Sequence, residues 1–305
     1  MIDRSVLLTG GSGFLGKAIK ARKDNHILSL GRSVSNDIIC DLAKDIPELD
    51  GKIYKVIHCA GKAHVVPKTK QEKQVFFDVN VQGTKNLLEG LEDHKSGIQQ
   101  FVFISTIAVY GKDQGRNISE EEPLLGDTPY AKSKIEAEQV LINWSKKHSI
   151  PLVILRLPLI VGDYPPGNLG AIIKAIQNGR YVRIRNNNAL KSVVLAHDVA
   201  NLISNLNGVS GIYNLTDGKH PSFKEIEDAI GFRFKKKIKI SLPIELLRMI
   251  AKVGDLIRVL KIPFPLYSER LNKMISSLTF SDEKARKELN WNPNPVLDFI
   301  RTEIK

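Results

Sequence analysis

Short apolar runs alternate with amphipathic segments through the first half of the chain. Five runs have the length and apolar content of buried strands: residues 5–10, 26–31, 55–61, 101–111 and 151–162. Between two of them, residues 78–93 place Leu87, Leu88 and Leu91 on one side of a helix. Strands that alternate with helices indicate a parallel sheet with helices on both faces. The pattern therefore predicts a doubly wound α/β fold.

The pattern changes beyond Val161, where a Pro/Gly-rich loop over residues 162–170 follows the last long strand. Shorter helical and strand-like segments then alternate, and Ser222 with Glu225 forms a predicted capping box at a helix start. We expect a large sheet domain over residues 1–162, to which a segment near 190–215 returns. A smaller mixed α/β lobe over residues 163–305 is interleaved with it.

Composition and charge narrow the function classes. The 305 residues are 42% hydrophobic and 26% charged, which is ordinary for a globular protein and argues against disorder. The formal net charge of +12 suits phosphate-bearing ligands or an anionic membrane face. The basic residues are dispersed and form no recognisable nucleic-acid-binding module, so we expect no nucleic acid partner. With only Cys40 and Cys59, the chain has neither a disulfide framework nor a four-thiolate metal site, and we expect no metal.

Two patterns bear on location. Asp3 and Arg4 precede a short apolar run, which is unlike a signal peptide, and no stretch of 18 apolar residues occurs, so we expect a cytoplasmic protein. Residues 235–265, in contrast, mix apolar residues at helical spacing with Lys and Arg. Such a helix can pack on the small lobe or rest on an anionic membrane surface. A peripheral position at the inner membrane face is therefore an alternative.

The segment TGGSGFLG, residues 9–16, follows the first predicted strand and opens a helix. Glycines in this order allow a tight turn and a close approach of backbone amides to a pyrophosphate, which predicts a Rossmann-type dinucleotide site. Small residues at the end of a later strand allow the same approach. Asp41 is a candidate for an adenine contact, although it can also cap a helix. The predicted cofactor residues in these segments are Gly10, Gly13, Phe14, Leu15, Gly16, Asp41, Leu42, Ala60 and Gly61.

The tip of the second predicted strand, in the sequence LSLGRS (28–33), offers Gly31, Arg32 and Ser33. This position lies beside the adenosine ribose in dinucleotide-binding proteins, where an acid suits a free 2′-hydroxyl and a base suits a 2′-phosphate. The Arg32 guanidinium can hold a phosphate through two hydrogen bonds, unless it is an exposed side chain without a role. The sequence therefore favours NADP(H), with NAD(H) as the alternative.

Tyr130 and Lys134 lie four residues apart and share one face of a predicted helix. A phenol with a pKa near ~10 is a weak base at neutral pH, so proton transfer requires a nearby cation that favours phenolate. Lys134 can supply this charge. The end of the run over residues 101–111 offers hydroxyl groups from Ser105 and Thr106, which can orient a substrate oxygen.

Together these motifs resemble the extended short-chain dehydrogenase/reductases, in the branch of NAD-dependent epimerases and dehydratases. The resemblance extends to LRLPLIVG (155–162), VLAHDVA (194–200) and FSDEKARKELNWNP (280–293). It implies that Tyr130 is the acid/base and that Lys134 holds the cofactor ribose and lowers the pKa of the tyrosine. It further implies that Thr106 binds the reacting sugar oxygen, a role that Ser105 can share, and that Pro158 lies beside the cofactor.

Within this family, 4,6-dehydratases carry an acidic pair where this chain has Ile107 and Ala108, which disfavours dehydration and, similarly, decarboxylation. Reduction of a 4-keto sugar and 4-epimerisation remain, both at C4 of a diphosphate-linked sugar. GKAHV (61–65) and PPGNLGAII (165–173) resemble 4-ketoreductases of surface-polysaccharide biosynthesis, so with Arg32 we favour an NADPH-dependent 4-ketoreductase. One alternative is a 4-epimerase of a UDP-sugar or of an undecaprenyl-diphosphate-linked sugar, and residues 235–265 resemble a segment of the enzymes that act on the lipid-linked sugar. The other alternative is an inactive dinucleotide-binding regulator.

The resemblance also implies substrate contacts and a partner. Asn168 matches an Asn near the substrate diphosphate, and Lys191 stands where many relatives carry an Arg for the same phosphates. A Lys keeps the charge but loses the bidentate geometry. His64 either touches the sugar or has no role. Family members commonly dimerise through a helix pair, and we expect a homodimer here.

Overall fold

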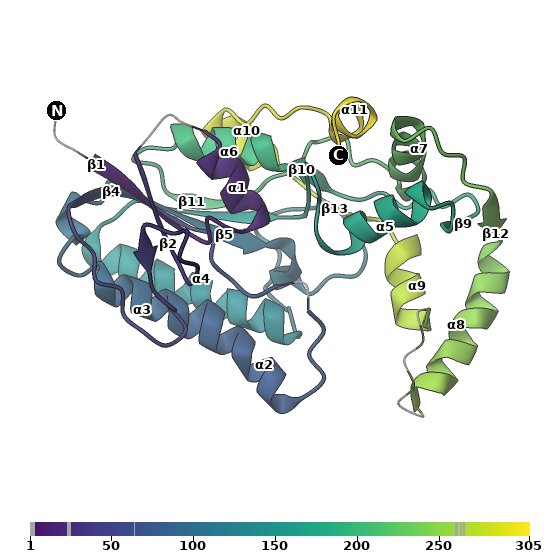
Figure 1. Ribbon diagram of the computed structural model, residues 1–305, viewed down its shortest axis with the longest axis horizontal. Helices are drawn as coiled ribbons and strands as arrows, with labels where there is room; N and C mark the ends of the chain where they lie inside the picture. Colours follow the sequence, from purple (N-terminus) through teal and green to yellow (C-terminus); the bar gives the residue numbers. More distant parts are fainter. Residues whose placement is uncertain (1–3, 23–25, 64, 260–261, 263, 265) are drawn as a thin grey trace.

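The computed structural model describes residues 4–22, 26–63, 65–259, 262, 264 and 266–305. Within these residues, seven strands form one parallel sheet in the order β11-β7-β5-β4-β1-β2-β3 (Figure 1). The strands are β1 (Arg4–Thr9), β2 (Ile27–Gly31), β3 (Ile38–Ile39), β4 (Lys52–His58), β5 (Gln100–Thr106), β7 (Leu152–Leu157) and β11 (Gly211–Asn214). This order, in which the chain winds outward from β1 in both directions, confirms the predicted doubly wound α/β fold.

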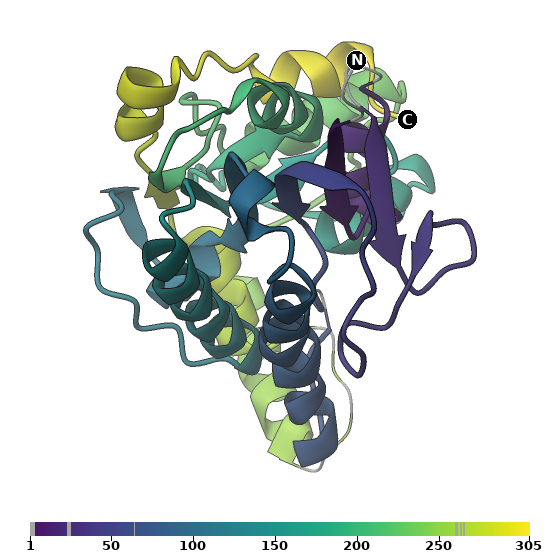
Figure 2. The same cartoon turned by 90° about the vertical axis from the view of Figure 1, so that its left-hand side faces the viewer.

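Helices cover both faces of the sheet, as Figures 1 and 2 show. On one face lie α1 (Phe14–Lys20) and α6 (Ala196–Asn205). On the other lie α3 (Gly83–Gly90) and α4 (Pro129–His148), and α2 (Lys70–Phe77) runs into α3 through a π-helical turn, Asp78–Gln82. Side chains alternate along β1, so that Leu8 packs with the first pair of helices and Leu7 with the second.

Small sheets and further helices surround the end of the large sheet. Three parallel two-stranded sheets pair β8 (Leu159–Val161) with β10 (Val193–Leu195), β9 (Val182–Ile184) with β12 (Ile240–Leu242), and β6 (Gly115–Ile118) with β13 (Leu278–Phe280). The helices are α5 (Gly167–Gln177), α7 (Phe223–Arg233), α8 (Ile244–Val259), α9 (Ser268–Ile275), α10 (Glu283–Leu289) and α11 (Val296–Thr302). Apolar side chains of α5, α7 and α11 share one core, and α8 and α9 share another.

Two predicted strands end earlier than their apolar runs. The run over residues 101–111 ends as a strand at Thr106, whose Oγ1 accepts a hydrogen bond from Ala108 N at 3.2 Å and so starts a short 3₁₀ helix, Ile107–Tyr110. The run over residues 151–162 divides at Pro158, which has no N–H to donate to a sheet. The part before Pro158 joins the large sheet as β7, and the part after it joins a small one as β8.

The capping box predicted at Ser222 and Glu225 is present at the start of α7, where each residue's side chain accepts a backbone hydrogen bond from the other. The predicted returning segment contributes β10, α6 and, at its end, β11, which pairs with β7 at the sheet edge. Among the described residues, no helix combines the length and the apolar character that a bilayer span requires.

Candidate active site

Close backbone contacts leave no room for a side chain at two glycines around the loop between β1 and α1. Gly10 has φ +71°, and a Cβ there would lie 2.6 Å from Ala60 N. A Cβ at Gly16 would lie 2.2 Å from the carbonyl oxygen of Gly10. At these two positions the loop therefore presents only backbone at the carboxyl edge of the sheet, directly before the amino terminus of α1. This cradle fits the pyrophosphate of a dinucleotide, as the glycine spacing predicts.

Strands β1 and β4 end level with each other at this edge, whereas β5 continues three residues beyond Phe103, the partner of His58, and ends level with β7. Thr9 pairs with His58, and Thr106 pairs with Leu157 across the neighbouring strands. Thr9 Oγ1 lies 2.6 Å from His58 Nδ1 and also accepts a hydrogen bond from Ala60 N at 3.1 Å. These two hydrogen bonds fix the end of β1, where the glycine loop begins, relative to the end of β4.

His58 is a buried, neutral member of this group. Its Nε2 lies 3.0 Å from Thr84 Oγ1, so both ring nitrogens have hydroxyl partners. Burial, with a smaller contribution from the positive charge of Lys134, lowers the pKa of His58 from 6.5 to about 3. The sequence does not identify His58 as a site residue, because a histidine inside an apolar run forms no motif and its hydrogen-bond partners lie on other elements.

This pKa predicts a loss of stability in acid. The unfolded chain binds a proton at His58 below pH 6.5, whereas the folded protein does not until about pH 3, so unfolding is favoured as the pH falls through this window. The slope from this one group is about 1.4 kcal/mol per pH unit. We expect His58→Asn to flatten the pH dependence of the free energy of unfolding between pH 6.5 and 3, measured by urea titration. Parallel pH profiles for the two proteins would contradict the assignment.

Thr106, Tyr130 and Lys134 meet beside this edge. Thr106 ends β5, and α4 carries Tyr130 in its first turn because Thr128 caps the helix, with its Oγ1 accepting from Ala131 N at 3.1 Å. The Tyr130 hydroxyl is hydrogen-bonded to Thr106. One turn later on α4, Lys134 Nζ donates a hydrogen bond to the carbonyl oxygen of Ile104, which is also on β5, at 2.6 Å.

Burial dominates the electrostatics of the two ionisable groups. It raises the pKa of Tyr130, and the hydrogen bond with Thr106 opposes this to a smaller extent. It lowers the pKa of Lys134 to about 7, although the negative charge of Glu138 opposes this shift. Lys134 Nζ also lies 3.8 Å from the centroid of the Phe103 ring, a cation–π contact. Lys134 therefore titrates close to neutral pH, the range in which a group that assists proton transfer is most effective.

Ser105 points to a different set of partners. Its hydroxyl donates to Glu138 Oε1, and the Glu138 carboxylate forms a bidentate pair with Arg156, with 2.7 Å between Nη2 and Oε2. Arg156 Nη1 in turn donates to the Tyr110 hydroxyl at 3.0 Å. All four side chains are buried behind Thr106 and Lys134. Ser105 alone of these four belongs to the predicted site; the other three were missed because they lie on separate elements, although Glu138 does follow Lys134 at the helical spacing of four.

The tip of β2 has the predicted arrangement of small and basic residues. Arg32 is exposed, and Asn36 lies over Gly31, donating from Nδ2 to the Ser33 carbonyl oxygen at 2.8 Å. The acid that follows, Asp37, accepts hydrogen bonds at Oδ2 from both the backbone N and the Oγ of Ser29. Its carboxylate is therefore engaged on the strand rather than at the tip.

Other predicted cofactor residues border the same edge. Asp41 Oδ1 accepts from Ala43 N at 3.3 Å within a turn, and no helix follows over residues 41–50, so the helix cap that was the alternative to an adenine contact does not form. Leu42 is buried in the core, and its carbonyl oxygen accepts from Asn86 Nδ2 at 2.8 Å. Pro158 is buried directly after β7. Gly61 packs against Asn80, a residue that was not predicted and that links the loop after β4 to Ser133 on α4.

Two of the three predicted substrate residues, Asn168 and Lys191, lie in the described part of the chain. His64 lies outside the described residues. Asn168 is exposed in the first turn of α5. Lys191 donates from Nζ to the carbonyl oxygens of Lys273 and Ser276, each at 2.7 Å, and so ties its segment to the end of α9.

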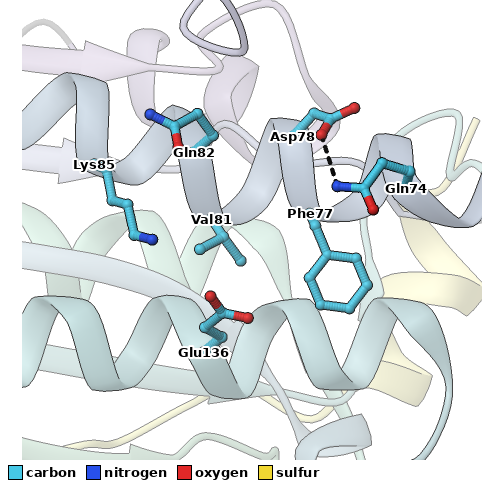
Figure 3. A pocket seen from close by; sticks show the side chains of 7 residues that line it. All are labelled: Gln74, Phe77, Asp78, Val81, Gln82, Lys85 and Glu136. Carbon is cyan, nitrogen blue, oxygen red and sulfur yellow. Dashed lines mark hydrogen bonds between the residues drawn. The ribbon is translucent and has the colours of Figure 1, made fainter.

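A surface cavity of about 370 Å³ lies away from this chemistry, on the outer side of the helices below the sheet (Figure 3). In Figure 3 the helix formed by α2 and α3 supplies most of its lining and α4 supplies one residue. The lining residues are Gln74, Phe77, Asp78, Val81, Gln82, Lys85 and Glu136. Since Tyr130 and Lys134 are not among them, this cavity is not the candidate active site.

Fold and site together define the class: a Rossmann-type enzyme with a backbone cradle for a dinucleotide and a tyrosine–lysine pair at the strand ends. Comparison with known proteins identifies the branch. The chain belongs to the NAD dependent epimerase/dehydratase family, whose model matches residues 6–207.

Relatives extend the match over most of the chain. UDP-glucose 4-epimerase of Vibrio cholerae is 24% identical over 319 residues, spanning 97% of this chain and 93% of the relative. N-acetyl-alpha-D-glucosaminyl-diphospho-ditrans,octacis-undecaprenol 4-epimerase of Escherichia coli O157:H7 is 29% identical over 254 residues, spanning 78% and 74%. The structure of Thermus thermophilus UDP-glucose 4-epimerase in complex with NAD has a similar fold, with a TM-score of 0.71 at 22% identity over 97% of this chain and 96% of that one.

Proposed function

We propose that this enzyme is a 4-epimerase of a diphosphate-linked sugar, and that Thr106, Tyr130 and Lys134 carry the reaction. The observation that supports it is the hydrogen-bonded Thr106–Tyr130 pair with Lys134 one turn away on α4. Ile107 and Ala108 follow directly, and at these two positions the side chains supply no acid or base for further chemistry such as dehydration. The names of the relatives favour epimerisation over the reduction that the sequence favoured.

Each residue has a distinct task in this proposal. Tyr130 takes the proton of the C4 hydroxyl and gives it back, and Thr106 holds the same sugar oxygen through its Oγ1. Lys134 stabilises the phenolate electrostatically from its position on the next turn of α4. The Ser105 hydroxyl, engaged with Glu138, positions this end of β5 instead of contacting the sugar. A bound nicotinamide dinucleotide supplies hydride acceptance and return at C4.

A product assay tests the proposal. Purified protein incubated with UDP-glucose or UDP-N-acetylglucosamine, or with the undecaprenyl-diphosphate-linked sugar, is expected to form the C4 epimer without net consumption of cofactor. Nuclear magnetic resonance of the sugar distinguishes the two C4 configurations. Stoichiometric oxidation of NADPH with a 4-keto sugar, and no epimer, would instead identify the second candidate, a 4-ketoreductase. Tight cofactor binding with no turnover of any of these sugars would favour a regulator without chemistry.

The second candidate is favoured by the β2 tip, where Arg32 is exposed and no acid stands. If Arg32 holds a 2′-phosphate, Arg32→Asp weakens NADPH binding by about 10–100-fold and changes NADH binding little, because hydrogen bonds to charged groups contribute roughly 1.5–3 kcal/mol. Fluorescence titration with both cofactors measures this. Arg116→Asp, at an exposed position on β6, is the matched control. Equal effects on the two cofactors would contradict a preference for NADP(H).

We also propose that the protein is a cytoplasmic homodimer that pairs through α4 and the helix formed by α2 and α3. The cavity in Figure 3 lies on this face and carries both a cation, Lys85, and an anion, Glu136, so two copies can offer each other opposite charges there. Sedimentation velocity gives the mass in solution, and a monomer at all concentrations would contradict the pairing.

A further inference from the structure

Helix α8 carries apolar side chains on two opposite sides. One side, with Leu247 and Ala251, packs against Leu271 of α9. The other side is open to solvent: Met249 is 61% exposed, Val253 55% and Leu256 69%. Since these three recur at intervals of four and three residues, they form a continuous stripe along the helix. Val259, 77% exposed at the end of α8, continues it.

This stripe, Met249, Val253, Leu256 and Val259, is unusual for a soluble surface. Single exposed apolar residues are common, but four in a row along one helix indicate a surface that is covered in use. In Figures 1 and 2, α8 extends from β12 to one side of the molecule, with α9 beside it. The proposed dimer face, on α2–α3 and α4, belongs to other helices.

Most of the charges beside the stripe are basic. Arg248 and Lys252 are exposed next to it on α8. Between residues 235 and 259 the chain carries seven Lys or Arg residues and two acidic ones. Of the acidic pair, Asp255 is engaged with the backbone N of Ser268 at 3.1 Å, and Glu245 is exposed in the first turn of α8, four residues before Met249. An apolar stripe flanked by cations complements the acyl boundary and the anionic headgroups of a membrane.

We propose that the exposed face of α8 is a docking surface for an anionic lipid membrane, on which the helix lies parallel to the bilayer plane. The stripe enters the headgroup boundary, and Arg248 and Lys252 contact anionic headgroups. Lys191, which precedes β10, is tied to the end of α9 by its two hydrogen bonds, so docking of α8 and α9 brings this part of the protein to the membrane. The surface does not depend on the reaction that the enzyme performs.

Sedimentation with vesicles tests this surface in the full-length protein. We expect the protein to pellet with vesicles of phosphatidylcholine and phosphatidylglycerol at low salt, and to pellet far less with phosphatidylcholine alone. Val253→Asp with Leu256→Asp should lower the partition coefficient at least about tenfold. Arg248→Glu with Lys252→Glu should do the same, because each basic residue near an anionic surface contributes about 1 kcal/mol, or roughly fivefold. All four side chains are exposed, so these variants retain the fold, which thermal unfolding verifies.

Matched changes elsewhere serve as controls. Leu125→Asp removes an exposed apolar residue from a loop, and Lys146→Glu with Lys147→Glu reverses two exposed charges on α4. Neither should alter partitioning. Wild-type protein that stays in the supernatant with anionic vesicles at low salt would overturn the proposal, as would equal losses in the controls. If the α8 variants change the sedimenting mass but not vesicle binding, a second copy of the chain covers the stripe instead.

Discussion

Tyr130→Phe is expected to lower the turnover number by about 10²–10⁴-fold while leaving dinucleotide binding unchanged, because the variant removes the acid/base and keeps the ring. The tilted contact between the rings of Tyr130 and Phe76, 6.2 Å apart, does not need the hydroxyl, so the fold is retained. Steady-state rates with the sugar identified in the product assay, together with cofactor titration, measure the two effects separately.

A second phenol provides the control. Tyr213 donates its hydroxyl to Glu288 at 2.9 Å and to the Ser210 carbonyl oxygen, away from the strand ends that form the site. Tyr213→Phe is expected to retain turnover within about twofold, since it leaves every proposed reacting group in place. Full turnover in Tyr130→Phe would refute the proposed mechanism. Equal losses in both variants would show that the effect arises from folding.

Arg156→Met is expected to destabilise the protein by about 3–5 kcal/mol, because it leaves Glu138 charged and buried without its partner. Both members of the pair are almost fully buried, with side-chain exposures of 3% and 2%. Replacing both, as Arg156→Met with Glu138→Leu, should recover much of this loss, since no uncompensated charge remains. Urea unfolding of the single and double variants measures the coupling.

The exposed pair Arg301 and Asp298 is the reference for this experiment. Their side chains are 46% and 68% exposed, and the distance between Arg301 Nη1 and Asp298 Oδ1 is 3.4 Å. Arg301→Met should change the free energy of unfolding by less than about 1 kcal/mol. A loss of this small size in Arg156→Met would mean that water reaches Glu138 in solution.

The sequence was most informative where chemistry depends on local order. The glycines of residues 9–16, the spacing of Tyr130 and Lys134, and the cap at Ser222 each act within a few neighbouring residues, so their spacing in the chain determines their geometry. The predicted ends of the strands were less accurate. Thr106 ends its strand by accepting a hydrogen bond from Ala108 N, and Pro158 ends another because it has no N–H to donate, and hydropathy registers neither effect.

Contacts between distant segments could not be predicted in this way. The partners of His58 come from β1 and α3, and the Ser105–Glu138–Arg156 network joins two strands to a helix. Lys191 was chosen for its charge, and the structure shows that its ammonium bonds carbonyl groups of a segment more than eighty residues later. Such partners follow from the topology of the sheet, which a periodic pattern does not specify.

The way in which late segments complete the sheet has a consequence for synthesis of the chain. The face of the sheet that carries Leu8 is covered in part by Val199 and Ile203 of α6 and by Trp291, all of which leave the ribosome after residue 162. At 5–20 residues per second, translation from residue 162 to Trp291 takes roughly 6–26 s. During this interval the apolar face is incompletely covered, so the nascent protein is a candidate client for chaperones that bind apolar surface.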